Sequence, residues 1–467
     1  MKMLIDGEWV TADKTIPVYN PYTGNLIDTV PRATIDDVRR AIKLSKNFKS
    51  KLSAYERSEI LRNTASELIQ RKEEFQICIT NETGMSLKNT SVEVDRSYEL
   101  LNIAAEESRQ IRGETIPLDY IQTTKAKFAI TLQEPVGLLS VITPFNRPLN
   151  QIVVKVAPAI ATNNSVILKP SEKTPLTAFK FGEVLMNNGL PANMVNIVTG
   201  DPDEIGDELI TNKNINMIVF TGSVEIGETI ASKTKIQNLN LELGGNDVLI
   251  IEDDANLELA VKLAVEGAFN SSGQVCRGVK RIIVLEKVAD MFVPKLVEAT
   301  KKLKCGDPLN NETDIGTMIS EEAAINVEQA INEAISDGAQ LIFGGERKGP
   351  LLRPTILDFV PPMIKLVTQE TFGPVAPVIR VPDMQKAIQI TNNTKYGLQA
   401  GVITNNLKKG FEYATHIQTG AVNINAGPQH GSPNIPFGGV KKSGIGRGGV
   451  KYAMREMTNT KTIVLNY

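Results

Sequence analysis

The hydrophobic period changes along the chain, and the change predicts where helices give way to strands. Apolar residues recur at three- to four-residue spacing in 34–49, 53–79 and 86–109. That spacing collects them on one face of a helix, so the first quarter is predicted to be mainly helical. The same pattern predicts helices at 174–188 and 320–336.

Short runs of strand-forming residues begin after this helical quarter. They occupy 138–143, 165–169, 195–199, 217–220 and 247–251. Their spacing of roughly 20–30 residues leaves room for a helix in the gaps, which predicts βαβ units and a mostly parallel sheet. This architecture is typical of nucleotide-binding proteins.

The later part of the chain adds further strands. A second α/β unit is predicted after Gly267, with one of its strands at 398–404. Residues 127–133 partly alternate apolar and polar side chains, and 462–467 form a short β-prone run. We expect these last two segments to pair with each other or to form a sheet edge.

Composition excludes several classes of protein. A chain of 467 residues is too long for one hydrophobic core, so two or three packed units are expected. The 51 basic residues nearly balance 53 acidic ones, which argues against nucleic-acid or membrane partners. There is no apolar run long enough to span a membrane, and the N-terminus does not resemble a secretory signal. A soluble, cytoplasmic protein is expected.

The three cysteines point to chemistry rather than to disulfides or metal. Cys78, Cys276 and Cys305 cannot all pair and do not have zinc-ligand spacing, so a reducing compartment and no metal site are expected. Cys276 lies in a small, polar turn, Phe269-Asn-Ser-Ser-Gly-Gln-Val-Cys276-Arg-Gly, that solvent or substrate could reach. Cys78 and Cys305 are interpreted as structural or incidental.

Two other segments place polar side chains at strand ends. Leu239-Asn-Leu-Glu242-Leu-Gly-Gly-Asn-Asp ends a short run on a carboxylate beside two glycines, where the chain can turn sharply. Val141-Ile-Thr-Pro-Phe-Asn146-Arg-Pro sets an amide just past a strand, where α/β sheets bind ligands. The alternatives are a solvated carboxylate at Glu242 and a turn-forming asparagine at position 146.

Together with four more motifs, these segments resemble the signature set of the aldehyde dehydrogenase superfamily. The further motifs are Lys169-Pro-Ser-Glu172, Phe220-Thr-Gly-Ser, Glu370-Thr-Phe-Gly-Pro-Val and Pro436-Phe-Gly-Gly. The resemblance covers almost the whole chain and is closest to the lactaldehyde and phosphonoacetaldehyde dehydrogenase branch. It implies Cys276 as nucleophile, Glu242 as general base and Asn146 as a donor to the oxyanion hole.

The resemblance also implies a cofactor site, for NAD with NADP as the alternative. No Gly-x-Gly-x-x-Gly follows a strand, and Gly222, Ser223 and Gly227 would take that place at a helix start. Packing alone is the alternative role for the two glycines, and a surface ion pair is the alternative for Lys169 and Glu172. The full candidate set is Thr143, Pro144, Lys169, Glu172, Phe220, Gly222, Ser223, Gly227, Glu370 and Phe372.

Substrate selection is assigned to cationic side chains near these motifs. Arg96, Arg147, Arg277 and His430 are the candidates, and a pocket holding two of them would select an aldehyde with an anionic group. Solvated or backbone-binding arginines are the alternative. Arg147 occupies a position that often holds a different residue in that branch, so the exact substrate does not transfer with the resemblance.

We predict an α/β fold of the aldehyde dehydrogenase type, with two doubly wound parallel-sheet domains and a small β oligomerisation element. The predicted parts are an NAD(P)-binding domain of residues 1–120 and 137–243, a catalytic domain of 244–441, and an oligomerisation element of 121–136 and 442–467. A homodimer or homotetramer is expected, because an exposed edge strand needs a cover. The alternative functions are a coenzyme A-dependent acylating semialdehyde dehydrogenase and a non-catalytic binding protein on the same scaffold.

Overall fold

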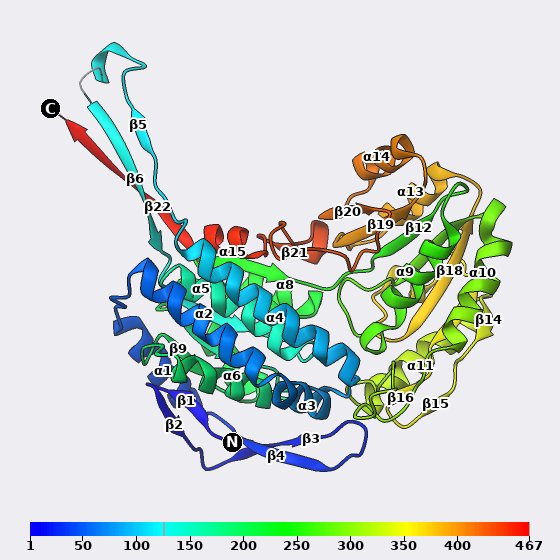
Figure 1. Ribbon diagram of the computed structural model, residues 1–467, viewed down its shortest axis with the longest axis horizontal. Helices are drawn as coiled ribbons and strands as arrows, with labels where there is room; N and C mark the ends of the chain where they lie inside the picture. The colour runs from blue at the N-terminus through cyan, green and yellow to red at the C-terminus, as the bar shows by residue number, and fades with distance from the viewer. Residues whose placement is uncertain (125–126, 467) are drawn as a thin grey trace.

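The computed structural model describes residues 1–124 and 127–466 and forms two α/β lobes with a projecting three-stranded arm (Figure 1). Two predicted segments are affected by the gaps. Residues 125–126 of the element 121–136, and residue 467 of the terminal strand, lie outside the described residues. Each lobe has its own buried hydrophobic core.

The helical first quarter is confirmed, with one division that the periodicity did not predict. The expected helix over 53–79 is two helices, because Arg71 leaves the helical conformation at φ −95° and ψ 20°. The first of them begins at a capping box between Ser53 and Glu56, and the second ends at Gly84 in the left-handed region. The helices are α1 (Ile35–Asn47), α2 (Ala54–Gln70), α3 (Lys72–Thr83) and α4 (Leu87–Ser108).

The first lobe is built on an eight-stranded sheet with a parallel centre. Five central strands, the third to the seventh in the order below, run parallel to one another, and the strands at both edges are antiparallel to them or to each other. The order is β2 (Glu8–Val10), β1 (Met3–Ile5), β9 (Val195–Ile197), β8 (Ser165–Lys169), β7 (Leu138–Ile142), β10 (Met217–Thr221), β11 (Asn238–Glu242) and β21 (Gly444–Ile445). The helices between these strands are α5 (Pro148–Ala161), α6 (Leu176–Asn187), α7 (Pro202–Thr211) and α8 (Val224–Lys233).

The second lobe is built on a seven-stranded, mostly parallel sheet. The strand at 247–251, which the spacing grouped with the earlier strands, belongs here, because the chain leaves the first sheet through Gly244 and Gly245. The order is β14 (Gln340–Phe343), β17 (Thr355–Asp358), β18 (Val375–Val381), β13 (Arg281–Leu285), β12 (Val248–Ile251), β19 (Gln399–Ile403) and β20 (Ala421–Ile424). Its helices are α9 (Leu257–Phe269), α10 (Glu286–Lys301), α11 (Glu321–Ser336), α12 (Lys365–Thr368), α13 (Met384–Asn392) and α14 (Leu407–His416).

The predicted pairing of the two edge segments is confirmed. β22 (Thr458–Asn466) runs antiparallel to β6 (Lys127–Pro135), with Ile463 opposite Ile130, and β5 (Thr115–Pro117) flanks β6. These strands form the arm that carries the C-terminus away from both lobes (Figure 1). The domain boundaries given above stay a prediction.

Smaller elements complete the description. Among the described residues, no helix has the length and apolar character needed to cross a bilayer. The remaining elements are β3 (Thr15–Tyr19), β4 (Leu26–Pro31), β15 (Arg347–Lys348), β16 (Leu351–Leu352), α15 (Val450–Glu456) and the 3₁₀ turns Gln122–Thr124, Asn270–Gly273 and Lys441–Ser443.

Candidate active site

A tight turn after α9 presents Cys276. Ser271, Ser272 and Gly273 adopt left-handed conformations in succession, which reverses the chain just before the cysteine. A Cβ at Gly273 would overlap the backbone of Gly373, so only glycine fits there. Lys280 then donates from Nζ to the carbonyl of Gly273 at 2.5 Å and ties the turn to β13.

The electrostatic surroundings of Cys276 act in both directions on its thiol. Burial raises the pKa of Cys276, and the charges of Glu370, Glu242 and Asp247 add to the rise. The positive charge of the neighbouring Arg277 lowers it. A bound cation or a proton acceptor is therefore needed to populate the thiolate near neutral pH.

Glu242 ends β11 and is fixed by two donors on one of its oxygens. Lys155 Nζ lies 3.2 Å from Glu242 Oε2, and Thr221 Oγ1 donates to the same oxygen at 2.9 Å. Oε1 accepts no hydrogen bond from the described residues. It lies so close to Gly448 that a Cβ added to that glycine would be 2.5 Å from it. The carboxylate is thus held in one orientation with one oxygen available.

Asn146 follows β7 and reaches the turn that precedes Cys276. Its Nδ2 donates to the backbone carbonyl of Gln274 at 3.0 Å, two residues before Cys276. A side-chain amide has a second N–H, which this contact leaves available for an oxyanion. Arg147 comes next in a left-handed conformation, at φ 56° and ψ 58°.

One cavity of about 240 Å³ brings these segments together. Six of the residues predicted for catalysis or substrate binding line it, and the seventh, His430, is exposed and does not. Its neighbours Gln429 and Gly431 line the cavity instead. The six are Arg96, Asn146, Arg147, Glu242, Cys276 and Arg277.

The three arginines have few partners on the protein. Arg277 stacks over the Phe437 ring at 5.4 Å, and Arg147 donates to Ser271 Oγ at 3.4 Å. Arg96 has a buried Nε with no hydrogen-bond partner, and burial, with the charges of the other two arginines, lowers its pKa to about 9. Within the described part of the chain, none of the three has a carboxylate within salt-bridge distance.

Several predicted cofactor residues lie together at the carboxyl ends of β7, β8 and β10. Thr143 and Pro144 follow β7, Lys169 ends β8, and Phe220 lies in β10. The N–H of Thr143 donates to the carbonyl of Lys169 at 3.1 Å. The buried Oγ1 of Thr143 has no hydrogen-bond partner among the described residues. Lys169 Nζ lies 3.6 Å from Glu172 Oε2, and burial lowers the pKa of the lysine.

The turn from β10 into α8 holds the other glycine-rich segment. Ser223 caps α8 by accepting from the Ile226 N–H at 3.3 Å. A Cβ at Gly222 would overlap the Phe220 ring, and one at Gly227 would overlap Leu243. Both glycines thus pack closely against neighbouring side chains, and a larger residue at either position would require those side chains to shift.

Glu370 and Phe372 come from the second lobe, between α12 and β18. Glu370 Oε1 accepts from the Gly245 N–H at 3.3 Å, and burial raises the pKa of Glu370 to about 7. Phe372 packs edge-on against Phe145 at 6.0 Å, beside the first-lobe loop that carries Asn146. None of the ten cofactor candidates lines the cavity around Cys276.

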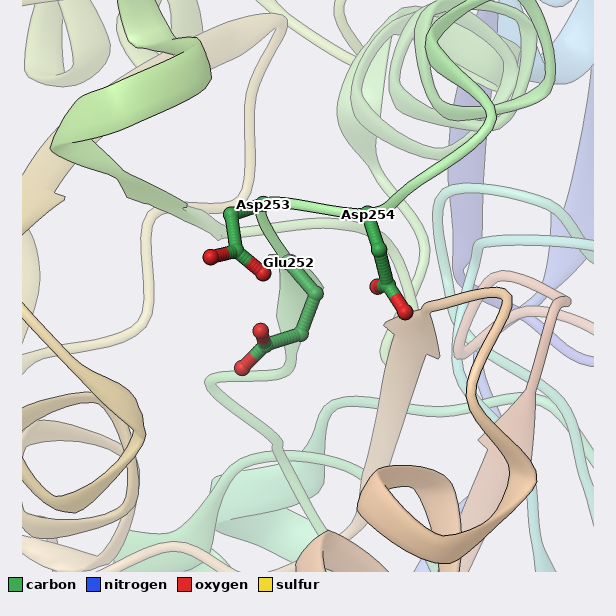
Figure 2. Close-up of side chains that lie close together, drawn as sticks. All are labelled: Glu252, Asp253 and Asp254. Atoms are coloured by element: carbon green, nitrogen blue, oxygen red, sulfur yellow. The ribbon is translucent and has the colours of Figure 1, made fainter.

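An acidic cluster at the end of β12 is the one group of described carboxylates close enough together to suggest a metal (Figure 2). Glu252 accepts from Tyr413 and Lys409, Asp253 from Lys409 and Lys287, and Asp254 from Thr404. These hydrogen bonds and ion pairs account for the cluster without a metal, and we assign none to it.

Sequence reasoning missed Lys155, Gln151 and Thr221, which lie around Glu242. Lys155 is 2% exposed and also donates to Gln151 Oε1 at 3.0 Å. A signal was available, because one lysine interrupts an otherwise apolar stretch of α5, and a buried charge requires a partner. Its spacing does not reveal that the partner is Glu242.

Comparison with known proteins places the chain in one family. The aldehyde dehydrogenase family pattern matches residues 9–463. A lactaldehyde dehydrogenase from Methanococcus aeolicus is 42% identical over 99% of this chain and 100% of its own length. A 3-sulfolactaldehyde dehydrogenase from Priestia aryabhattai is 40% identical over 99% of this chain and 98% of its own.

Solved structures agree in fold. Aldehyde dehydrogenase 21 of Physcomitrella patens, complexed with the reaction product succinate, superimposes with a TM-score of 0.97 at 36% identity, over 100% of this chain and 98% of that one. Glyceraldehyde-3-phosphate dehydrogenase of Methanocaldococcus jannaschii, complexed with NADP, gives a TM-score of 0.94 at 38% identity, over 97% of this chain and 100% of that one. Betaine aldehyde dehydrogenase of Staphylococcus aureus, complexed with NAD+, gives a TM-score of 0.95 at 33% identity, over 100% of this chain and 95% of that one.

These matches confirm the predicted α/β fold with its parallel-sheet domains, and the prediction of an oxidoreductase. They also confirm the resemblance drawn from the seven sequence motifs. Both relatives are matched over nearly their whole length. The chain belongs to the aldehyde dehydrogenase family.

Proposed function

We propose that this protein oxidises a small aldehyde with an anionic or hydroxyl group to its carboxylic acid, with Cys276 as nucleophile. The observation that carries the proposal is the cavity itself. It is lined by a thiol, a carboxylate and an amide from three remote segments, and by three arginines without carboxylate partners. Family membership makes the protein an aldehyde-oxidising, NAD(P)-dependent enzyme.

The residues present fit a nicotinamide dinucleotide. The buried Thr143 Oγ1 has no partner, and the capped start of α8 offers first-turn N–H groups to a pyrophosphate. Lys169 and Glu172 are assigned to the adenosine ribose, and Glu370 with Phe372 to the nicotinamide ribose. A carboxylate at Glu172 accepts ribose hydroxyls and repels a 2′-phosphate, which favours NAD over NADP. When bound, the nicotinamide accepts the hydride that leaves the aldehyde carbon.

The chemistry of the protein begins at the sulfur. The Cys276 thiolate attacks the aldehyde carbon to form a C–S bond, and Asn146 donates a hydrogen bond to the resulting oxyanion. One such donor contributes about 3–4 kcal/mol of transition-state stabilisation. When the carbonyl re-forms, the C–H bond of that carbon breaks with loss of the hydride, and a thioester to Cys276 remains.

Glu242 then completes the turnover. Its free Oε1 takes a proton from a water that attacks the thioester carbon, and the C–S bond breaks to return the thiolate and release the acid. Lys155 and Thr221 hold Oε2, so Glu242 stays oriented through the formation and the hydrolysis of the thioester. A carboxylate so placed favours water over coenzyme A as the acyl acceptor.

The arginines support the choice of substrate. Arg96, Arg147 and Arg277 offer charge-assisted hydrogen bonds to a carboxylate, phosphonate, phosphate or sulfonate. Relatives named for lactaldehyde and 3-sulfolactaldehyde agree with a short, polar aldehyde of this kind. Arg96 has a buried Nε without a hydrogen-bond partner among the described residues, and a bound anion offsets the cost of burying that charged group.

An aldehyde panel tests the proposal. The purified protein is incubated with NAD or NADP and with lactaldehyde, 3-sulfolactaldehyde, phosphonoacetaldehyde, glyceraldehyde 3-phosphate, succinate semialdehyde or propanal, and NAD(P)H absorbance is followed. We expect turnover without coenzyme A and a preference for an anionic aldehyde. Strict dependence on coenzyme A would support acyl transfer, and no reduced cofactor with any aldehyde would support a binding protein. Faster oxidation of propanal than of every anionic aldehyde would refute the arginine assignment.

We also propose a cytoplasmic homodimer or homotetramer. β22 is exposed along almost its whole length, and Ile463, Val464 and Leu465 are all exposed. An uncovered strand of this kind favours association through the arm. Light scattering coupled to size-exclusion chromatography, with a chain lacking 458–467 as the comparison, tests this; a monomer at every concentration would contradict it.

A further inference from the structure

The helix that follows Asn146 has no capping side chain of its own. α5 begins at Pro148, and the preceding Arg147 is left-handed and makes no side-chain cap. The first N–H groups of a helix need acceptors. Here the N–H groups of Leu149 and Asn150 both donate to Glu93 Oε1, at 2.9 and 3.1 Å. The acceptor comes from α4, 56 residues earlier in the chain.

Glu93 is unusually placed for a carboxylate. It is 0% exposed, and among the residues that the structure describes its Oε2 has no hydrogen-bond partner. Burial raises its pKa to about 7, while the positive charge of Arg147 acts on it and lowers that pKa. A buried carboxylate is costly to keep, so its place requires a compensating role. The role that the contacts indicate is to fix the start of α5 against α4.

Leu149, whose N–H donates to Glu93, lies three residues after Asn146, whose side-chain amide is assigned to the oxyanion hole. A non-glycine residue in the left-handed region persists only where its surroundings hold it. The contact to Glu93 holds the chain on one side of Arg147, and the Asn146 hydrogen bond to Gln274 holds it on the other. Loss of the first contact lets the turn relax and moves the Asn146 side chain.

We propose that Glu93 is a positioning residue, which anchors the start of α5 so that Asn146 faces the carbon attacked by Cys276. The inference rests on the proposed role of Asn146 in the oxyanion hole. Glu93 acts through the backbone of α5 and is not among the residues that line the cavity.

The same fold contains a matched control. Glu82 of α3 is also 0% exposed, and it accepts from the N–H groups of Leu176 and Thr177 at the start of α6, at 2.8 and 3.2 Å. α6 likewise begins without a capping side chain of its own. No residue of α6 lines the cavity. Glu82 also accepts from Thr177 Oγ1, so Glu82→Ala removes the same two backbone contacts and one side-chain contact from a helix outside the aldehyde site.

The experiment compares the two glutamates at saturating cofactor. We expect Glu93→Ala to lower kcat about ten- to a hundredfold, the size of effect typical of a misplaced catalytic group. Glu93→Gln keeps an oxygen that accepts both N–H groups, so kcat should stay within about threefold of wild type. Glu82→Ala should lose thermal stability as Glu93→Ala does and change kcat less than about threefold.

A double-mutant cycle with Asn146 separates positioning from general weakening. In the Asn146→Ala background, Glu93→Ala should lower kcat by no more than about threefold, because the group it positions is gone. If Glu93→Ala does not yield folded protein, Glu93→Asp, one methylene too short to reach both N–H groups, takes its place with Glu82→Asp as control.

Two results would overturn the inference. One is a kcat for Glu93→Ala (or for Glu93→Asp, where that variant takes its place) within about threefold of wild type despite lost stability, and the other is an equal loss of kcat in the corresponding Glu82 variant. Failure of the proposed function is distinguished by the wild type alone, since a wild-type protein that reduces no NAD(P) with any aldehyde refutes that function whatever the variants do.

Discussion

The polar groups of the cavity are held in two different ways. Those assigned to bond making and breaking have fixed partners, because Glu242 contacts Lys155 and Thr221, and Asn146 donates to the Gln274 carbonyl. Among those assigned to substrate selection, Arg96 has a buried Nε without a hydrogen-bond partner in the described part of the chain, and Arg277 lies over the Phe437 ring. The difference teaches that, on the proposed assignment, the protein itself orders the reacting groups. The groups proposed to select the substrate are left for the ligand to order.

Removal of the sulfur should have the largest effect. We expect Cys276→Ser to lower kcat/KM by about a thousandfold or more, because a hydroxyl is a far weaker nucleophile than a thiolate. Cofactor reduction with the best aldehyde of the panel measures this. Cys305→Ser, which changes a cysteine in the second lobe away from the cavity, should keep wild-type activity. Equal loss in both variants would remove the special role of Cys276.

Neutralising Glu242 should have the next largest effect. We expect Glu242→Gln to lower kcat about a hundred- to a thousandfold, with acyl-enzyme accumulating because water is no longer activated. A rapid burst of NAD(P)H followed by slow turnover would identify the blocked step. Lys155→Met should give a smaller loss of the same kind, since Glu242 keeps only Thr221. A Glu242→Gln variant with normal steady-state turnover would contradict the assignment.

Changing an arginine should alter selection rather than chemistry. We expect Arg96→Met to raise the KM for an anionic aldehyde about tenfold, the loss of roughly one charged hydrogen bond, with kcat little changed. The KM for propanal should not rise. Lys173→Met, an exposed cation outside the cavity, serves as the control. An equal fold increase in the KM for both aldehydes would mean that Arg96 supports the fold and does not bind the anionic group of the substrate.

The smallest effect concerns the pH dependence of the thiol. Burial raises the pKa of Cys276, so its rate of alkylation by iodoacetamide should still be increasing above pH 8.5, the ordinary thiol value being about 8.5. Arg277 opposes that rise, so Arg277→Met should move the pKa higher and slow alkylation at pH 8 several-fold. A rate that levels off below pH 8, or that Arg277→Met leaves unchanged, would contradict this account.

Local patterns were sufficient to predict the elements that carry the site. The strands that end at Ile142, Lys169 and Thr221 are predicted from short apolar runs to within one residue, and the turn before Cys276 is predicted from its small polar residues. These features depend on neighbours in sequence, so periodicity and turn chemistry can detect them.

Contacts between remote segments could not be predicted in the same way. The partner of Lys155 lies 87 residues away and the acceptor for α5 lies 56 residues away, and no spacing rule connects either pair. His430 illustrates the limit at short range, because it is exposed while the adjacent Gln429 lines the cavity. In a loop, the direction of each side chain depends on backbone angles that composition does not fix.

The position of β21 has a consequence for synthesis of the protein. This strand pairs with β11, with Gly444 opposite Glu242, so the edge of the first sheet is supplied by a segment that is synthesised roughly 200 residues after β11. At about 5–20 residues per second, the nascent chain waits roughly 10–40 s between the two strands. During that interval the edge beside the future base is open to misplaced pairing, and a chaperone able to shield it should improve the yield of active enzyme.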